Sequence, residues 1–331
     1  MKIIIIAEAG VNHNGNINLA KKLILAAANS GADYIKFQTY ETENLIRPNT
    51  KLARYQKENI KIDKTQYQML KKYKLKKNYY KILIQYAKKR KIGFISSPFD
   101  IESLKFLKKF NLDFIKIPSG EIDNFPLLKE IGKLNNKVIL STGMASINEI
   151  NNALKILKKF GTKKERISLL HCHSDYPSKP ENLNLKAIVT LKKRFNLKVG
   201  YSDHSLGIEA PVISTSLGAE IIEKHLTLNN KMKGPDHIAS MEPKLFSEMV
   251  LAIRKAEKML GNGKKIPTNI ELKNKQFVRK SIVAKTKIKK GEQFSIANIT
   301  TKRPGTGKSP MLFERILKKR AKKNYQEDDF I

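Results

Sequence analysis

Residues 3–10 read Ile3-Ile-Ile-Ile-Ala-Glu-Ala-Gly10, an apolar run that carries one carboxylate, Glu8, near its end. Similar short apolar runs recur along the chain, and amphipathic stretches separate them. The runs lie at 34–37, 93–96, 114–117, 138–141, 167–171, 198–201 and 221–225, and the main amphipathic stretches at 19–30, 79–90, 101–110, 147–160, 185–195 and 247–260. Continuous apolar runs of this length are typical of strands buried on both faces, as in a parallel sheet.

The number of these units indicates the architecture. About eight strand and helix units in about 260 residues is the size of a (β/α)8 barrel. A doubly wound open sheet is the structural alternative. Polar side chains follow nearly every run, and this favours the barrel, because all its strands end on one face, where active sites lie. We therefore predict an α/β fold with a (β/α)8 barrel at residues 1–262.

The pattern changes after Gly261-Asn-Gly263. Residues 263–276 are polar and predict a linker with a short helix. Residues 277–331 alternate as β-strands do, with turn signals at Lys290-Gly291 and Pro304-Gly305. A module this short has little room for a core of its own, so we expect it to pack on a partner surface.

The composition is strongly basic, with 65 Lys and Arg, 30 Asp and Glu, and a net charge of +35. The basic residues are spread over many amphipathic segments without interleaved aromatics, so we do not expect nucleic-acid binding. The charge should help to attract anionic small substrates. Cys172 is the one cysteine, so no internal disulfide is possible. No apolar run reaches the roughly 20 residues of a membrane helix, and the first run lacks a signal-peptide cleavage site. We expect a cytoplasmic protein.

Two histidines end consecutive predicted strands. They are His204 in Tyr201-Ser-Asp-His204 and His225 in Glu223-Lys-His225. Neighbouring strands lie about 4.7–4.9 Å apart, so both imidazoles could reach one ion. Imidazole with oxygen ligands suits divalent Mn, Fe, Co, Ni or Zn. The alternative for either histidine alone is a hydrogen-bonded packing residue.

A second group of strand-end residues suits an anionic ligand. Lys36 and Lys116 end apolar runs, where a buried ammonium needs an anionic partner. That partner could be a phosphate or carboxylate ligand, or one of the carboxylates Glu8 and Glu121. Serine hydroxyls could donate to phosphate oxygens, although each serine alone could be a helix cap. The serines are Ser97, Ser119 and Ser202.

These residues lie within a series of motifs in order along nearly the whole chain. The motifs are Glu8-Ala-Gly-Val-Asn-His-Asn-Gly15, Lys36-Phe-Gln-Thr39, Ser96-Ser-Pro-Phe99, Lys116-Ile-Pro-Ser-Gly-Glu121, Ser141-Thr-Gly-Met144, Leu170-His-Cys172, Tyr201-Ser-Asp-His204, Glu223-Lys-His225, Gly234-Pro-Asp-His237 and Lys302-Arg-Pro-Gly305. The chain thereby resembles the sialic acid synthase family, which includes N-acetylneuraminate, legionaminate and pseudaminate synthases. The tail from Phe277 looks like the antifreeze-like (SAF) domain of that family.

The resemblance implies a (β/α)8 barrel followed by a β-clip SAF domain at 277–331. It also implies an enzyme that condenses phosphoenolpyruvate with an N-acylated amino sugar, either N-acetylmannosamine or a 2,4-diacetamido-hexose. The implied cofactor is a divalent metal, Mn2+ first, with Mg2+ or Co2+ as alternatives. The implied assembly is a domain-swapped homodimer.

The resemblance also implies roles for residues at matching positions. His204 and His225 would bind the metal, and Glu8 would lie near the metal and the reacting carbons. Phosphoenolpyruvate would contact Lys36, Ser97, Lys116, Ser119, Ser174 and Ser202. The sugar would contact Gln38, Glu121, Tyr176, Asp236 and, from the SAF domain of a second subunit, Arg303.

Some features depart from the family pattern or leave alternatives open. Ser174 stands where some members have Asn, and the stretch 173–179 is unusual. The motifs are most similar to the N-acetylneuraminate and N,N'-diacetyllegionaminate branch, without separating the two. The rival functions are another phosphoenolpyruvate-dependent barrel aldol synthase, which would need an extra basic pocket for a sugar phosphate, and a basic nucleic-acid-binding protein.

Overall fold

The computed structural model describes residues 2–53, 56–57, 59 and 65–331. The chain divides into two compact units, Met1–Gly261 and Asn262–Ile331. Each unit is described by itself below.

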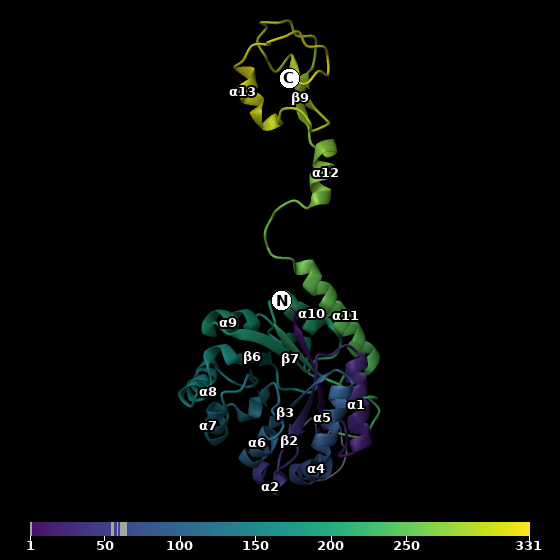
Figure 1. Ribbon diagram of the computed structural model, residues 1–331, viewed down its shortest axis with the longest axis vertical. Coiled ribbons are helices and arrows are strands. Elements are labelled where there is room, and N and C mark those ends of the chain that lie inside the picture. The colour runs from purple at the N-terminus through teal and green to yellow at the C-terminus, as the bar shows by residue number, and fades with distance from the viewer. Residues whose placement is uncertain (1, 54–55, 58, 60–64) are drawn as a thin grey trace. The chain divides into compact units, whose positions relative to one another are not determined.

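The first unit is a closed barrel of parallel strands in sequence order, with β1 and β8 adjacent (Figure 1). The strands are β1 Ile4–Gly10, β2 Tyr34–Thr39, β3 Gly93–Pro98, β4 Ile115–Ile117, β5 Val138–Ser141, β6 Ile167–Cys172, β7 Lys198–Asp203 and β8 Ile221–His225. The predicted barrel is confirmed, and the open doubly wound sheet is wrong, because the pairing of Ile4 with Ile221 closes the sheet.

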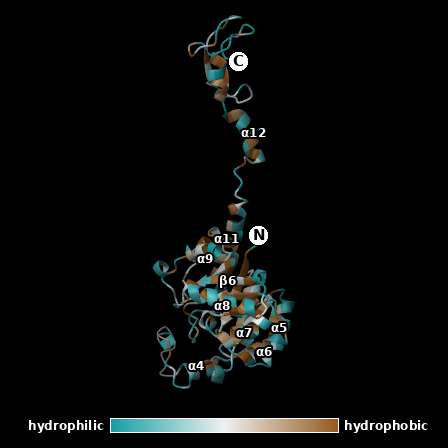
Figure 2. Ribbon diagram, turned by 90° about the vertical axis from the view of Figure 1, so that its left-hand side faces the viewer, coloured by the Kyte–Doolittle hydropathy of each residue, from teal (hydrophilic) through white to brown (hydrophobic). Residues whose placement is uncertain are grey.

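Helices cover the outside of the barrel (Figure 1). All α-helices described in this unit are α1 Ile17–Asn29, α2 Thr42–Leu45, α4 Gln66–Tyr73, α5 Tyr79–Lys89, α6 Ile101–Lys108, α7 Phe125–Leu134, α8 Ile147–Lys159, α9 Ala187–Phe195, α10 Glu209–Ser216 and α11 Pro243–Leu260. Figure 2 shows hydrophilic and hydrophobic residues on the same helices, as in amphipathic helices. In α8, for example, Ile150, Ala153, Leu154 and Leu157 recur at helical spacing and are buried.

The barrel interior has an apolar layer, and a polar layer lies beyond it toward the carboxyl ends of the strands. Ile6, Ile95, Ile139, Leu170 and Ile221 are buried and form an apolar cluster with Phe114. Alternate strand residues face the same side of a sheet. The residues two positions further along the same strands are Glu8, Ser97, Ser141, Cys172 and Glu223. The apolar layer therefore supports a layer of polar side chains at the carboxyl ends of the strands.

The second unit contains α12 Asn269–Val278, β9 Ser281–Ala284, β10 Ile299–Lys302 and α13 Phe313–Leu317. Strands β9 and β10 pair antiparallel, while segment 288–292 contributes only an isolated bridge between Ile288 and Tyr325. This unit has a small hydrophobic core. The core comprises Ile282, Ala284, Ile288, Phe294, Ile299, Ile316, Ala321, Tyr325 and Ile331.

Among the described residues, no helix combines the length and apolar character that a membrane crossing needs.

Candidate active site

A cleft of about 570 Å³ opens at the carboxyl ends of the barrel strands. Most residues singled out from the sequence line it, although they come from distant parts of the chain. These lining residues are Glu8, Lys36, Gln38, Lys116, Ser119, Ser174, Tyr176, Ser202, His204, His225 and Asp236. The strand ends bring them together as the barrel prediction requires.

Three predicted site residues do not line this cleft. Ser97 is fully buried next to Gln38 in the sheet register, and its hydroxyl has no hydrogen-bond partner among the described residues. Glu121 lies in a 3-10 helix, Ser119–Glu121, where its carboxylate accepts a 2.6 Å hydrogen bond from Asn124. Arg303 is exposed and directly follows β10 in the second unit.

Two lysines and two carboxylates form the floor of the cleft. Lys36 Nζ lies 3.0 Å from Glu223 Oε1 and 3.4 Å from Glu8 Oε1. Lys116 Nζ lies 3.5 Å from the same Glu223 oxygen, which also accepts a 3.1 Å hydrogen bond from Ser202. A carboxylate was the alternative partner expected for each lysine. Lys36 does contact Glu8, as expected. Lys116 contacts Glu223 instead of Glu121.

The two carboxylates have pKa values shifted in opposite directions. Burial would raise the pKa of Glu223, but Lys116 and Lys36 outweigh it and lower this pKa to about 2. Burial raises the pKa of Glu8, against the effect of Lys36, and the charge of Glu223 raises it further. Glu223 is therefore ionised, whereas the pKa of Glu8 lies above its ordinary value. Carboxyl pairs with separated pKa values are typical of acid and base roles.

Burial also acts on the two lysines and on Asp236 in the cleft. It lowers the pKa of Lys116 to about 8, against the attraction of Glu223. For Lys36 the charges of Glu223 and Glu8 outweigh burial, so its pKa is raised. Burial, with the charge of Glu8, raises the pKa of Asp236 to about 7. Lys116 and Asp236 are therefore the groups whose charge would change near neutral pH.

Several buried polar atoms around the cleft have no hydrogen-bond partner among the described residues. They are Glu8 Oε2, Glu223 Oε2, Ser97 Oγ, Ser141 Oγ and His225 Nδ1. Buried polar groups are rarely left unpaired, so a cluster of them indicates the place of a polar ligand.

Small side chains gather around Gly143 on one side of the cleft. The Gly143 amide donates a 3.0 Å hydrogen bond to Ser119 Oγ. A Cβ atom at Gly143 would lie 2.8 Å from Ser119 Oγ and 2.7 Å from Cys172 Sγ, and it would also collide with Ser174 Oγ. Hydroxyls and a backbone N–H packed this closely suit an anion with several oxygens.

His204 and His225 line the same cleft as Ser119 and Ser174. The ring centroids of His204 and His225 are 5.6 Å apart. His204 Nδ1 bonds to the His173 carbonyl oxygen at 2.6 Å, which fixes this nitrogen as a donor and leaves Nε2 with a lone pair. Burial lowers the pKa of His204 to about 4 and that of His225 well below its usual value, so both rings are neutral, as metal ligands must be.

These rings fit a metal that keeps open positions. Within the described part of the chain, no three or more His, Cys, Asp or Glu side chains are arranged to hold an ion. Two neutral imidazoles with available nitrogens could still hold a divalent ion whose other positions go to substrate or water. Tyr176 covers His204, with ring centroids 4.0 Å apart.

One wall of the cleft is largely apolar, although Gln56 and Gln66 also belong to the lining. It is lined by Val11, Leu45, Ile46, Met69, Leu70, Tyr73 and Phe99. Val11, Met69 and Tyr73 form a buried hydrophobic cluster. The partly buried Leu52 and Leu70 pack against this cluster. The cleft therefore pairs a charged, hydroxyl-rich side with a wall suited to methyl or acyl groups.

Comparison with known proteins shows the family to which the barrel belongs. The sequence profile of the NeuB family matches residues 23–265, and that of the SAF domain matches residues 279–331. The chain belongs to the NeuB family. Both expectations, the sialic acid synthase family and its SAF domain, are confirmed.

NeuB-family relatives match along nearly the whole chain. The N,N'-diacetyllegionaminic acid synthase of Campylobacter jejuni is 52% identical over 330 residues, covering 100% of this chain and 99% of that protein. The pseudaminic acid synthase of the same organism is 37% identical, and the match covers 99% of this chain and 95% of that protein. The crystal structure of N-acetylneuraminic acid synthetase from Leptospira borgpetersenii, in complex with citrate, has a TM-score of 0.73 and 37% identity, covering 83% of this chain and 90% of that one.

One central residue of this NeuB-family cleft received no role from the sequence. Glu223 contacts both lysines and Ser202. The sequence could have indicated this role, because Glu223 lies two residues before His225 and alternate residues of a strand face the same side. Met69 and Leu70 were also missed, since they belong to α4, outside the strand ends that the sequence pattern marked.

Proposed function

We propose that this chain condenses phosphoenolpyruvate with an N-acylated amino sugar and water, releasing phosphate and a sialic-acid-type nonulosonate. The observation that carries the proposal is the meeting, in one cleft, of the buried Lys36 and Lys116 with the neutral His204 and His225 pair. The names of the relatives that match the whole chain support the same reaction class.

We assign the donor site to the lysine side. Lys36, Lys116 and the hydroxyls of Ser119, Ser174 and Ser202 offer charge and donors for the phosphate and carboxylate of phosphoenolpyruvate. The unpaired Ser97 hydroxyl lies beneath them and would complete this set. An incoming anion would share the lysines with Glu223, which holds both ammonium groups at the same oxygen.

We assign a divalent metal to His204 and His225, with Mn2+ as the first choice and Mg2+ or Co2+ as alternatives. When bound, the metal would supply Lewis acidity toward the aldehyde oxygen of the open-chain sugar. The imidazoles suit this role because the Nδ1 bond of His204 orients its ring and leaves Nε2 available.

The protein residues would position and protonate the reacting groups. Lys36 and Lys116 hold phosphoenolpyruvate while its C3 attacks the aldehyde carbon, and positive character develops at C2. Water then adds at C2, its proton leaves, and phosphate departs with cleavage of the C–O bond. Glu8, with its raised pKa and its unpaired Oε2, is the proposed carrier of a proton to or from the reacting oxygens.

We place the sugar between Gln38, Tyr176 and Asp236 and the apolar wall. Glu121 and Arg303 complete the proposed sugar contacts, with Arg303 supplied by a second copy of the chain in a domain-swapped homodimer. The apolar wall offers a surface for the acyl groups of either sugar. The 52% identical relative, an N,N'-diacetyllegionaminic acid synthase, favours a 2,4-diacetamido-hexose over N-acetylmannosamine.

The remaining assignments concern domain roles and location. We propose catalytic residues on the barrel of 1–262, a linker at 263–276 and a SAF domain at 277–331 that serves a neighbouring subunit. We also propose that the enzyme works in the cytoplasm, where its lone Cys172 would stay reduced.

A phosphate-release assay tests the function. The purified protein with Mn2+ and phosphoenolpyruvate is offered 2-acetamido-hexoses, 2,4-diacetamido-hexoses and sugar phosphates. Release with a diacetamido sugar, and much less with N-acetylmannosamine, is the expected result. Release only with a sugar phosphate would instead support the rival aldol synthase.

A further inference from the structure

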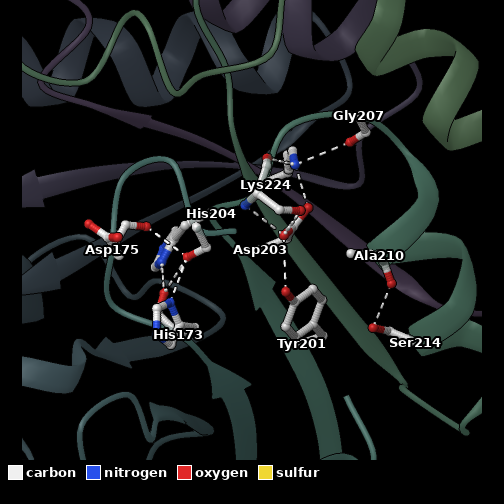
Figure 3. Close-up of polar contacts among 11 residues, drawn as sticks. His173, Asp175, Tyr201, Asp203, His204, Gly207, Ala210, Ser214 and Lys224 are labelled. Carbon is white, nitrogen blue, oxygen red and sulfur yellow. Dashed lines mark hydrogen bonds and ion pairs between the residues drawn. The ribbon is translucent and has the colours of Figure 1, made fainter. Parts of the chain in front are cut away.

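Behind the two histidines lies a buried ion pair that faces away from the cleft. In the β7 and β8 register, Ser202 pairs with Glu223, and Asp203 with Lys224. Ser202, His204, Glu223 and His225 line the cleft. Asp203 and Lys224 alternate with them, are buried and bond to each other on the far side (Figure 3).

The pair is the centre of a fully occupied polar network (Figure 3). Asp203 Oδ1 accepts hydrogen bonds from the Tyr201 hydroxyl at 3.0 Å, the Ser205 amide at 2.9 Å and the Ser205 hydroxyl at 2.7 Å. Lys224 Nζ donates to Asp203 Oδ2 and to the carbonyl oxygens of Ser205 and Gly207. The ammonium group thus directs all three of its protons to fixed acceptors.

This network fixes the backbone on both sides of His204. Asp203 precedes that histidine and Ser205 follows it, and both belong to the network. The His204 carbonyl oxygen accepts a 2.9 Å hydrogen bond from the Ser178 amide, and its ring bonds to His173. Lys224 also directly precedes His225 on β8. One ion pair therefore joins the two segments that carry the imidazoles.

Stability alone gives little reason to keep such a pair. Two buried charges lose their hydration, and well-packed apolar residues often hold strands together as well or better. An apolar pair could not bind the Ser205 and Gly207 carbonyl oxygens, however. What the charged pair adds is a fixed course for the turn that presents His204.

We propose that Asp203 and Lys224 are positioning residues that set the separation and orientation of His204 and His225. This inference rests on the proposed metal role of the two histidines. It predicts that metal affinity depends on the pair even when the fold does not.

The test compares two double variants with the full-length parent. Asp203→Asn/Lys224→Met removes both charges at similar volume and leaves no buried charge unpaired. Asp33→Asn/Arg254→Met is the control, because it removes a different ion pair, which is 2.8 Å long, only partly buried and directly before β2. Each protein is stripped with chelator, its unfolding temperature is measured, and Mn2+ is titrated by calorimetry.

The Asp203 and Lys224 variant should fold and bind Mn2+ at least tenfold more weakly, in the range seen when the partners of metal ligands are removed. The control should keep the parent's Mn2+ affinity whatever its unfolding temperature. A folded Asp203 and Lys224 variant with parent affinity would overturn the positioning role. A parent that binds no Mn2+ would overturn the metal pair itself, and this inference with it.

Milder variants cover the case in which the double variant does not fold. Tyr201→Phe and Ser205→Ala each remove one hydroxyl that donates to Asp203 and keep the ion pair. Combined, they should still weaken Mn2+ binding severalfold. Parent affinity in that folded protein would overturn the claim that the hydrogen bonds of Asp203 position His204.

Discussion

The ammonium group of Lys36 on β2 lies 3.0 Å from Oε1 of Glu223 on β8, although strand β1 stands between their strands. Lys116 reaches the same oxygen from β4, at 3.5 Å. A single carboxylate oxygen therefore holds both cations of the proposed donor site, and the charge of each lysine depends on it.

Lys116 should give the donor requirement its pH dependence. Its pKa is lowered to about 8, chiefly by burial, so the ammonium form prevails below that pH and is lost above it. The KM for phosphoenolpyruvate should rise above about pH 8, whereas the KM for the sugar should change nearer pH 7, where Asp236 loses its proton. Steady-state kinetics between pH 6.5 and 9.5 check this.

Variants at Lys116 and Glu223 extend that test. Lys116→Ala should raise the KM for phosphoenolpyruvate far more than that for the sugar, because a hydrogen bond between charged groups is worth about 1.5–3 kcal/mol. Glu223→Gln should move the pH-dependent rise to lower pH, because Glu223 raises the pKa of Lys116. A change in the sugar KM alone would contradict the assignment of the donor side.

Gly143→Ala should disable the donor site without unfolding the protein. The new methyl group would collide with Ser119, Cys172 and Ser174, which the proposed phosphate contacts need. We expect at least a tenfold loss in kcat/KM for phosphoenolpyruvate and an unfolding temperature close to the parent's. Gly120→Ala is the comparison, because it adds a methyl group to the same cleft next to Ser119 but meets no protein atom within 4 Å. Equal activity in both variants would place phosphate elsewhere.

The buried histidines should make the fold acid-sensitive. Burial lowers the pKa of His13 and His204 to about 4 each, against 6.5 in an unfolded chain. As the pH falls below 6.5, these histidines take up protons in the unfolded state but stay neutral in the folded state, so the free energy of unfolding decreases. At pH 5 the loss is on the order of 2 kcal/mol per histidine. Urea unfolding in chelator at pH 7 and pH 5 measures it, and equal stability at both would contradict the prediction.

The outline of the barrel was predictable because its strands are continuous apolar runs and most helices have clear amphipathic spacing. Helix α10 has no such apolar stripe, because its buried face consists of the small or polar residues Ala210, Pro211, Ser214 and Thr215. The strand-end residues of the cleft could likewise be marked in advance. The partners of Lys224 could not, because its contacts to the Ser205 and Gly207 carbonyl oxygens depend on the course of a turn.

Arg303 should act across subunits. A guanidinium presents a planar set of donors that lysine lacks, so Arg303→Lys should impair sugar use while Mn2+ binding stays intact. Co-expressed Arg303→Ala and His204→Ala chains, each inactive alone, should form heterodimers with one complete site. Verified heterodimers without activity would show that this arginine does not act in trans.

The central claim is a condensation in which phosphoenolpyruvate loses phosphate through its C–O bond. The most direct measurement uses phosphoenolpyruvate labelled with 18O at the bridging oxygen, together with a 2,4-diacetamido-hexose and Mn2+, and follows both products by mass spectrometry. The account predicts a product with the mass of the sugar plus phosphoenolpyruvate plus water minus phosphate, with the label in the released phosphate. Phosphate release without that product, or label retained in the sugar acid, would contradict it.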